Sequence, residues 1–261
     1  MIVALFALLG LAVGSFLNVV IHRVPRDESV VDPPSHCPGC GHAVRWFDNV
    51  PVVSWLVLRG RCRDCGTRIS PRYVLVEAVT GILFGLICWA TIDGSFASIV
   101  LALVWSLGAA LAVCLSLIDI AVRRLPRSIV KPATTATVLG LALVAQLTGA
   151  GDQLVRAVLA GAALYAAFLI LELIYPAGMG HGDTMLVGLL GLYLGWLGWP
   201  QVIIGIFAGF LCGGVYSLVL VVVGRAGRKS MIPFGPFLIL GTTIGMIWGE
   251  RLGTAYLSLI V

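Results

Sequence analysis

Residues 97–119 read ASIVLALVWSLGAALAVCLSLID, an uncharged and mostly apolar run that ends at Asp119. The hydrocarbon core of a bilayer is about 30 Å thick and takes roughly 20 apolar residues of helix to cross, so this run is long enough to span a membrane. The rest of the chain has the same character, because 59% of its 261 residues are hydrophobic and only 11% are charged. Mean hydropathy is +1.04. We therefore expect an all-α polytopic membrane protein.

Further apolar runs lie on both sides of this one and predict about eight transmembrane helices, of which the sixth is short. The expected spans are 2–21, 74–92, 97–118, 128–148, 154–175, 184–197, 200–223 and 233–257. Glycines four residues apart, as at Gly205 and Gly209, predict close packing between helices. The chain is expected to divide into a first transmembrane helix at 1–22, a cytoplasmic loop at 23–73 and a membrane core at 74–261.

The basic residues predict the orientation in the membrane. Of the 17 lysines and arginines, all except Arg156 and Arg251 fall on one side of the eight-span arrangement. They stand in the first loop, after the third span and after the seventh span, and an excess of positive charge marks the cytoplasmic side. The N-terminus is then outside, and the first run is a membrane anchor without the basic start of a signal peptide. The net charge of +5 follows from the same rule, so we expect membrane lipid as a partner and no nucleic acid.

Four cysteines form two C-x2-C pairs in the expected cytoplasmic loop. They are Cys37 with Cys40 and Cys62 with Cys65. Each pair can chelate one metal ion from a tight turn, and four thiolates fill the tetrahedral shell of Zn²⁺ without leaving an open position. The spacing therefore predicts a structural zinc site. Disulfide or redox chemistry is the alternative, and a cytoplasmic location disfavours both.

Two aspartates lie at the ends of expected spans. Asp119 ends the third span, which runs inward, and Asp183 precedes the sixth, which runs outward, so both belong near the cytoplasmic boundary. A carboxylate near lipid is costly, which makes each aspartate a functional-site hypothesis. Gly180 and Gly182, on either side of His181, favour an open and non-helical backbone just before Asp183.

Two neighbouring carboxylates suit acid/base catalysis. They cannot both ionise easily, so one keeps a proton. The ionised group can take a proton from a water molecule that attacks a peptide carbonyl, and the protonated group can donate to the carbonyl oxygen or to the leaving amine. In the alternative, Asp119 only ends a helix beside Arg123 and Arg124, while Asp183 caps the next helix.

Three other polar residues near the expected boundary have simpler expected roles. Glu77 and Glu172 are predicted to be hydrogen-bond partners at helix ends or between helices. His181 can bond an aspartate or face water, and we expect it to face water.

These features, in this order, resemble the bacterial type IV prepilin leader peptidases, which are aspartyl proteases of the membrane. The likeness covers nearly the whole chain. Besides the cysteine pairs and Asp119, it rests on residues 14–25 (GSFLNVVIHRVP), 46–51 (WFDNVP), 60–63 (GRCR), Ile69-Ser70, Glu77, Leu125-Pro126, 180–183 (GHGD) and 232–237 (IPFGPF).

The resemblance implies a function and a set of roles. Asp119 and Asp183 would be the catalytic aspartates, the second in a GxGD motif with Gly180 and Gly182. The substrates would be prepilins and pseudopilins of type IV pili and type II secretion, cut after a glycine that follows a basic leader, at the cytoplasmic face of the bacterial inner membrane. Many members then methylate the new N-terminus with S-adenosylmethionine. The cysteine loop accompanies that second activity, so we expect both, although the sequence shows no S-adenosylmethionine-binding signature.

The chain departs from the family pattern at three positions. Met185 stands where the family commonly has lysine, Arg127 where it often has Asp or Asn, and Val74 where it often has proline. The first two bear on substrate docking or efficiency more than on the chemistry. Two other functions fit membrane carboxylates, namely a transporter and a non-catalytic component of a pilus or secretion assembly. The lack of inverted repeats disfavours the first, and the intact aspartate pair disfavours the second.

Overall fold

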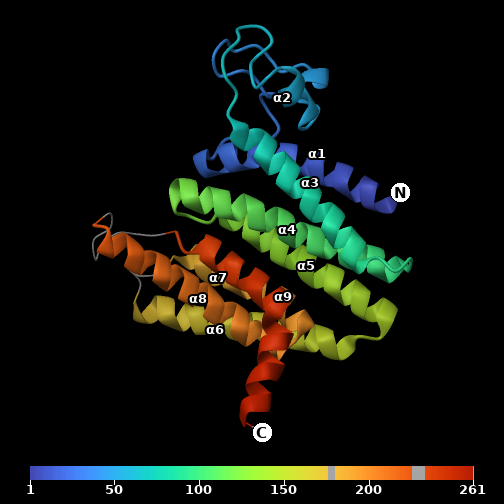
Figure 1. The fold of residues 1–261 in the computed structure, drawn as a ribbon, viewed down its shortest axis with the longest axis vertical. Coiled ribbons are helices and arrows are strands. Elements are labelled where there is room, and N and C mark those ends of the chain that lie inside the picture. The colour runs from blue at the N-terminus through green and yellow to red at the C-terminus, as the bar shows by residue number, and fades with distance from the viewer. Residues whose placement is uncertain (176–179, 225–232, 261) are drawn as a thin grey trace. The chain divides into compact units, whose positions relative to one another are not determined.

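A computed structural model of the chain describes residues 1–175, 180–224 and 233–260 (Figure 1). The basic residues after the expected seventh span, Arg225, Arg228 and Lys229, and the first residue of the 232–237 motif, Ile232, lie outside the described residues. The described part is helical and contains no named β-strand. Its long helices are α1 (Ile2–Arg23), α3 (Pro71–Thr91), α4 (Phe96–Val122), α5 (Arg127–Thr148), α6 (Gly151–Ile174), α7 (His181–Leu197), α8 (Trp199–Val222) and α9 (Gly235–Ile260). Short helices η1 (Val24–Arg26), η2 (Trp46–Asn49) and α2 (Val53–Val57) lie in the loop between α1 and α3.

The prediction of an all-α polytopic membrane protein is confirmed. Six of the described helices, α1, α3, α4, α5, α6 and α8, are long and apolar enough to cross a membrane. The number eight was approximate, because α7 and α9 coincide with expected spans but are not among these six. The short sixth span corresponds to α7, which has 17 residues.

The start of α7 differs from the expectation. The non-helical backbone expected just before Asp183 is not found, because α7 begins at His181 with Gly180 as its N-cap. The backbone amides of Asp183 and Thr184 donate to the Gly180 carbonyl at 2.9 and 3.4 Å, which closes the first turn. Asp183 therefore projects from a helix and not from an open loop.

The chain forms two compact units, Met1–Cys114 and Leu115–Val261. In the first unit, α1 and α3 lie side by side, with the loop that carries α2 between them in sequence (Figure 1). Glycines allow the two helices to approach closely, because a Cβ on Gly14 would lie 2.7 Å from the Cα of Glu77. This is the packing role expected for the spaced glycines.

The second unit contains the last turns of α4 and the helices α5 to α9. Helix α6 packs on α7, and α8 packs on α9. Both contacts use glycine, since a Cβ on Gly191 would lie 2.8 Å from the Cα of Gly161, and one on Gly245 would lie 2.7 Å from the Cα of Gly205. A buried hydrogen bond of 3.0 Å between Thr137 and Tyr193 ties α5 to α7. Asp119 and Asp183 both belong to this unit.

Candidate functional site

Asp119 lies near the C-terminal end of α4 and is only 4% exposed. Its carboxylate Oδ2 accepts a hydrogen bond of 2.9 Å from the backbone amide of Gly235, the first residue of α9. In the described part of the chain it forms no ion pair with Arg123 or Arg124, both of which are exposed. The alternative in which Asp119 only ends a helix beside two arginines therefore does not describe its contacts.

Asp183 lies in the first turn of α7 and is partly buried. The N-cap position belongs to Gly180, so Asp183 is not the N-cap residue that the alternative required. The carboxylate folds back over this turn, and its Oδ2 lies 3.4 Å from the place where a Cβ on Gly180 would stand. Gly180 therefore leaves room for the Asp183 carboxylate.

Leu125 is the neighbour that links the two aspartates. A Cβ on Gly182 would lie 2.7 Å from the Leu125 Cβ, so the backbone beside Asp183 touches Leu125. A Cβ on Gly235, whose amide bonds Asp119, would lie 3.5 Å from the Leu125 Cδ1. Leu125 thus lies beside Gly182, which precedes Asp183, and beside Gly235, which bonds Asp119, all in the second unit.

Glu172 holds the first turn of α7 against α6. It accepts a hydrogen bond of 2.8 Å from the hydroxyl of Thr184, which is fully buried, and both of its carboxylate oxygens lie 3.1 Å from Nδ1 of His181. Glu172 is thus the interhelical hydrogen-bond partner that was expected. The expectation that His181 faces water was wrong, because Glu172 lies within reach across the helix pair. Since Thr184 follows Asp183 directly, this contact fixes the backbone that carries the aspartate.

The four cysteines of the loop form a single cluster. Their sulfur atoms all lie within 4.8 Å of one another, and none of them is in a disulfide. A tetrahedral Zn²⁺ with Zn–S bonds of about 2.3 Å separates its sulfur ligands by roughly 3.8 Å. The distance between Sγ of Cys37 and Sγ of Cys65 is 3.7 Å, so the cluster fits such an ion.

Each C-x2-C pair forms the same kind of turn. The Cys37 amide donates to the His42 carbonyl at 2.9 Å, and the Cys62 amide donates to the Thr67 carbonyl at 2.9 Å. A glycine follows each pair in the left-handed region, with φ of 73° at Gly41 and 70° at Gly66, where a side chain would be strained. Local sequence therefore builds two similar turns that present their thiols to one another.

The chemistry of the thiols suits a metal site. Contacts with the hydroxyl and the backbone amide of Thr67 lower the pKa of the Cys65 thiol to about 6, whereas burial and the neighbouring thiols raise the pKa of the Cys40 thiol to about 12. The thiolate is the form that binds a metal. His36 and His42, which flank the first pair, are exposed and take no part in the cluster.

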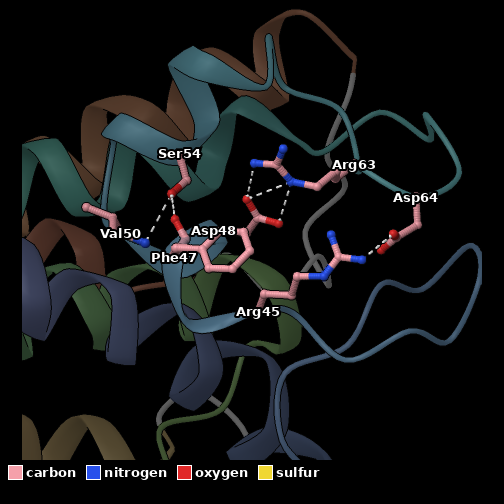
Figure 2. Close-up of polar contacts among 7 residues, drawn as sticks. All are labelled: Arg45, Phe47, Asp48, Val50, Ser54, Arg63 and Asp64. Carbon is pink, nitrogen blue, oxygen red and sulfur yellow. Dashed lines mark hydrogen bonds and ion pairs between the residues drawn. The ribbon is translucent and has the colours of Figure 1, made fainter.

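Two ion pairs join the two halves of the loop, and sequence reasoning did not find them (Figure 2). Arg63 donates to both oxygens of Asp48, with a shortest distance of 2.6 Å, and Arg45 bonds Asp64 at 2.9 Å. The Arg63 guanidinium also lies 5.6 Å from the centre of the Phe47 ring. Hydrogen bonds from Arg63 hold the pKa of Asp48 below its usual value. The sequence shows an arginine and an aspartate in each half of the loop, but it does not indicate which arginine pairs with which aspartate.

Comparison with known proteins places the chain in a family. A model described as Bacterial Peptidase A24 N-terminal domain matches residues 8–91, and one described as Type IV leader peptidase family matches residues 106–218. The chain is similar to proteins named prepilin leader peptidase/N-methyltransferase. It is 34% identical to that of Stutzerimonas stutzeri, over 96% of this chain and 92% of the relative. It is 42% identical to that of Myxococcus xanthus, over 85% of this chain and 64% of the relative.

The relative from Pseudomonas aeruginosa is also 34% identical, again over 96% of this chain. No solved structure matches the chain. The resemblance found in the motifs is confirmed by matches that extend over both compact units. The chain therefore belongs to the type IV leader peptidase family and is a peptidase that carries several membrane-spanning helices.

Proposed function

We propose that this chain is a membrane aspartic endopeptidase that removes the basic leader of prepilins and pseudopilins, with Asp119 and Asp183 as its catalytic pair. The observation that carries the proposal is that Gly182, next to Asp183, and Gly235, which bonds Asp119, both lie against Leu125, although the helices that carry the two aspartates lie far apart in sequence. Cleavage would follow the glycine that ends the leader. The bias of the basic residues supports a pair at the cytoplasmic boundary and an N-terminus outside.

The contacts suggest how the two aspartates divide the work. A backbone amide can only donate, so the bond from Gly235 favours the ionised form of Asp119. With Asp119 ionised, its negative charge favours the protonated form of Asp183. Asp119 would then take a proton from the attacking water, while Asp183 would give its proton to the carbonyl oxygen. As the C–N bond breaks, the proton on Asp119 would pass to the leaving amine, and the hydroxyl of the intermediate would return a proton to Asp183. Gly180 and Gly182 would leave the space that this arrangement needs.

The cysteine loop would serve a structural role beside this chemistry. Cys37, Cys40, Cys62 and Cys65 would hold Zn²⁺ with all four positions filled, so the ion would cross-link the two turns and would have no position for a substrate. The relatives' names include N-methyltransferase, and we extend the proposal to methylation of the new N-terminus with S-adenosylmethionine. We assign no residue to that methyl donor.

The test is cleavage of a peptide with a basic leader, a glycine and an apolar segment by the purified full chain in liposomes. We expect Asp183→Asn to lose cleavage. Asp152→Asn should keep it, because Asp152 is an exposed aspartate in the first turn of α6, at the other end of that helix from Glu172. Labelled S-adenosylmethionine should mark the product of the wild type. Equal cleavage by Asp183→Asn and wild type would overturn the catalytic pair, and an unlabelled product would overturn only the methylation.

A further inference from the structure

Helix α2 exposes an apolar face although it lies outside the spanning helices. Val53, Leu56 and Val57, at helical spacing, are 55%, 60% and 70% exposed. The opposite side of the helix is occupied, since Ser54 is buried and the Trp55 indole donates to the Ile69 carbonyl at 3.3 Å. Three neighbouring apolar side chains that face away from the loop call for an apolar surrounding.

The position of α2 relative to α3 supplies that surrounding. The backbone amide of Val52, the residue before α2, donates to the Glu77 carboxylate at 2.8 Å. Glu77 lies about 9 Å along α3 from its first residue, Pro71, at 1.5 Å per residue. Exposed Arg72 and Tyr73 at the start of α3 are residue types that mark a membrane–water interface. A membrane surface at Arg72 and Tyr73 would therefore put the start of α2 within the interfacial region, where amphipathic helices insert.

The loop also folds back along α1. A cavity of about 430 Å³ is lined by Phe16 of α1 and by Val31 and Pro33 of the loop. Phe16 precedes the last residue of α1, Arg23, by roughly 10 Å of helix. A hydrogen bond to α3 and a cavity shared with α1 thus place loop segments beside the spanning helices, away from the ends that carry the loop.

A basic pocket begins where the apolar face ends. Arg59, Arg61 and Arg68 line a pocket of about 460 Å³, together with Ser70 and Pro71 at the start of α3. All three arginines are exposed, and in the described part of the chain none of them pairs with a carboxylate. The amino end of α3 adds its own positive field to the pocket. This grouping of like charges favours an anion, and a guanidinium matches a phosphate group.

We propose that this part of the loop is a binding site for anionic phospholipid, in the leaflet that holds the start of α3. Val53, Leu56 and Val57 would contact the acyl chains, and Arg59, Arg61 and Arg68 would bind the headgroup phosphate. An anionic phospholipid carries both an acidic headgroup and apolar acyl chains, and so it matches the arginines and the apolar face together. A basic prepilin leader would be repelled by the three arginines. The site is independent of the aspartate pair, and it would keep the cysteine loop against the membrane surface.

The test compares binding of phosphatidylglycerol and phosphatidylcholine to the full zinc-loaded chain in detergent, by native mass spectrometry. The test variant carries Arg59→Gln, Arg61→Gln and Arg68→Gln. The matched control carries Arg26→Gln, Arg123→Gln and Arg124→Gln, which removes the same charge from exposed arginines outside the pocket. We expect phosphatidylglycerol to bind about tenfold or more tightly than phosphatidylcholine to the wild type and the control, and this preference to be lost in the test variant. An equal loss of this lipid preference in both variants would mean that only net charge matters, and it would overturn the proposed lipid site.

Two further measurements separate lipid from other occupants. Inorganic phosphate at millimolar concentration should not displace phosphatidylglycerol, and full displacement would reduce the site to an adventitious ion only. In liposomes, p-benzoylphenylalanine at position 56 should form photo-adducts with lipid, whereas the same group at position 42, on an exposed turn of the cysteine cluster, should not. Adducts from position 56 to a second copy of the chain, or no lipid adduct, would overturn the proposal. Unchanged zinc content in each variant shows that the loop is still folded.

Discussion

The cysteine loop and the aspartate pair are assembled in opposite ways. In the loop, the four thiols come from two short turns of similar design, and the bonds that shape each turn run between residues close in sequence. The aspartates come from α4 and α7, and a third helix, α9, supplies the amide that bonds Asp119. The loop is largely exposed, whereas Asp119 is buried. The difference teaches that local turns can bring four thiols together, whereas two aspartates on separate helices are positioned only by the packing of several helices.

The comparison predicts its largest effect at Asp119. Asp119→Asn keeps the shape of the side chain but removes the base, so we expect cleavage to fall about 10³-fold or more. Zinc content should not change, because the cysteine loop belongs to the other compact unit. Thermal unfolding should change little, because the asparagine side-chain oxygen can still accept the Gly235 hydrogen bond. Peptide cleavage, metal analysis and a melting curve measure all three. A loss of zinc in this variant would show that the two regions are not separate.

The reverse prediction concerns Cys37→Ser. Removal of one thiolate should reduce bound zinc from about one ion per chain to about none, since metal binding and folding of the loop are coupled. Limited proteolysis should then cut the loop between α1 and α3. Cys88→Ser is the matched control, because this buried cysteine lies in α3 away from the cluster. Full zinc occupancy in Cys37→Ser would contradict the four-thiolate site.

An intermediate effect is expected from the helix packing around Asp119. A Cβ on Gly235 would lie 2.9 Å from Oδ2 of Asp119, so Gly235→Ala must displace the carboxylate or the start of α9. Because displacements of about 1 Å cost roughly a hundredfold in rate, we expect cleavage to fall about tenfold to a hundredfold. Gly214→Ala in α8 is the control, since its Cβ would meet nothing within 4 Å. Equal rates in the two variants would argue against a role for the α9 amide.

A smaller effect is expected at Glu172, which bonds His181 and Thr184 in the first turn of α7. Glu172→Gln keeps an acceptor for Thr184 but removes the charge beside His181, so the cleavage rate should fall by about two- to tenfold. The double variant with Thr184→Val shows whether the two residues act as a unit, because coupled positions lose less together than the sum of their separate losses. Strictly additive losses would show that Glu172 does not act through Thr184.

The smallest effect belongs to the loop's ion pairs. Arg63→Lys keeps the charge but loses the fork that holds both oxygens of Asp48. Exposed ion pairs contribute little, so the rate of zinc loss to a chelator should change by less than about twofold at physiological salt. Zinc loss at least tenfold faster than from the wild type would show that the ion pairs contribute strongly to holding the loop.

Much of the fold followed from the sequence alone. Apolar runs such as 97–118 predicted the spanning helices because bilayer thickness sets their length, and C-x2-C spacing predicted which four residues meet because both pairs lie in tight turns. The boundaries were less certain. The turn at Gly180 starts a helix three residues earlier than the apolar pattern indicated, since hydropathy does not record the hydrogen bonds that close a first turn.

Only the tertiary structure decided how the polar residues pair. Counting spans put Asp119 and Asp183 at one boundary, but the Gly235 amide, the Leu125 contact and the Glu172 clamp come from helices far apart in the chain. The partners of Arg63 and Arg45 also could not be predicted from the sequence, because each half of the loop contains an aspartate that either arginine could bind. Hydrophobicity and local turn geometry act over a few residues and are visible in a sequence. A hydrogen bond between helices depends on their axial register and close approach, which are set only when the whole unit packs.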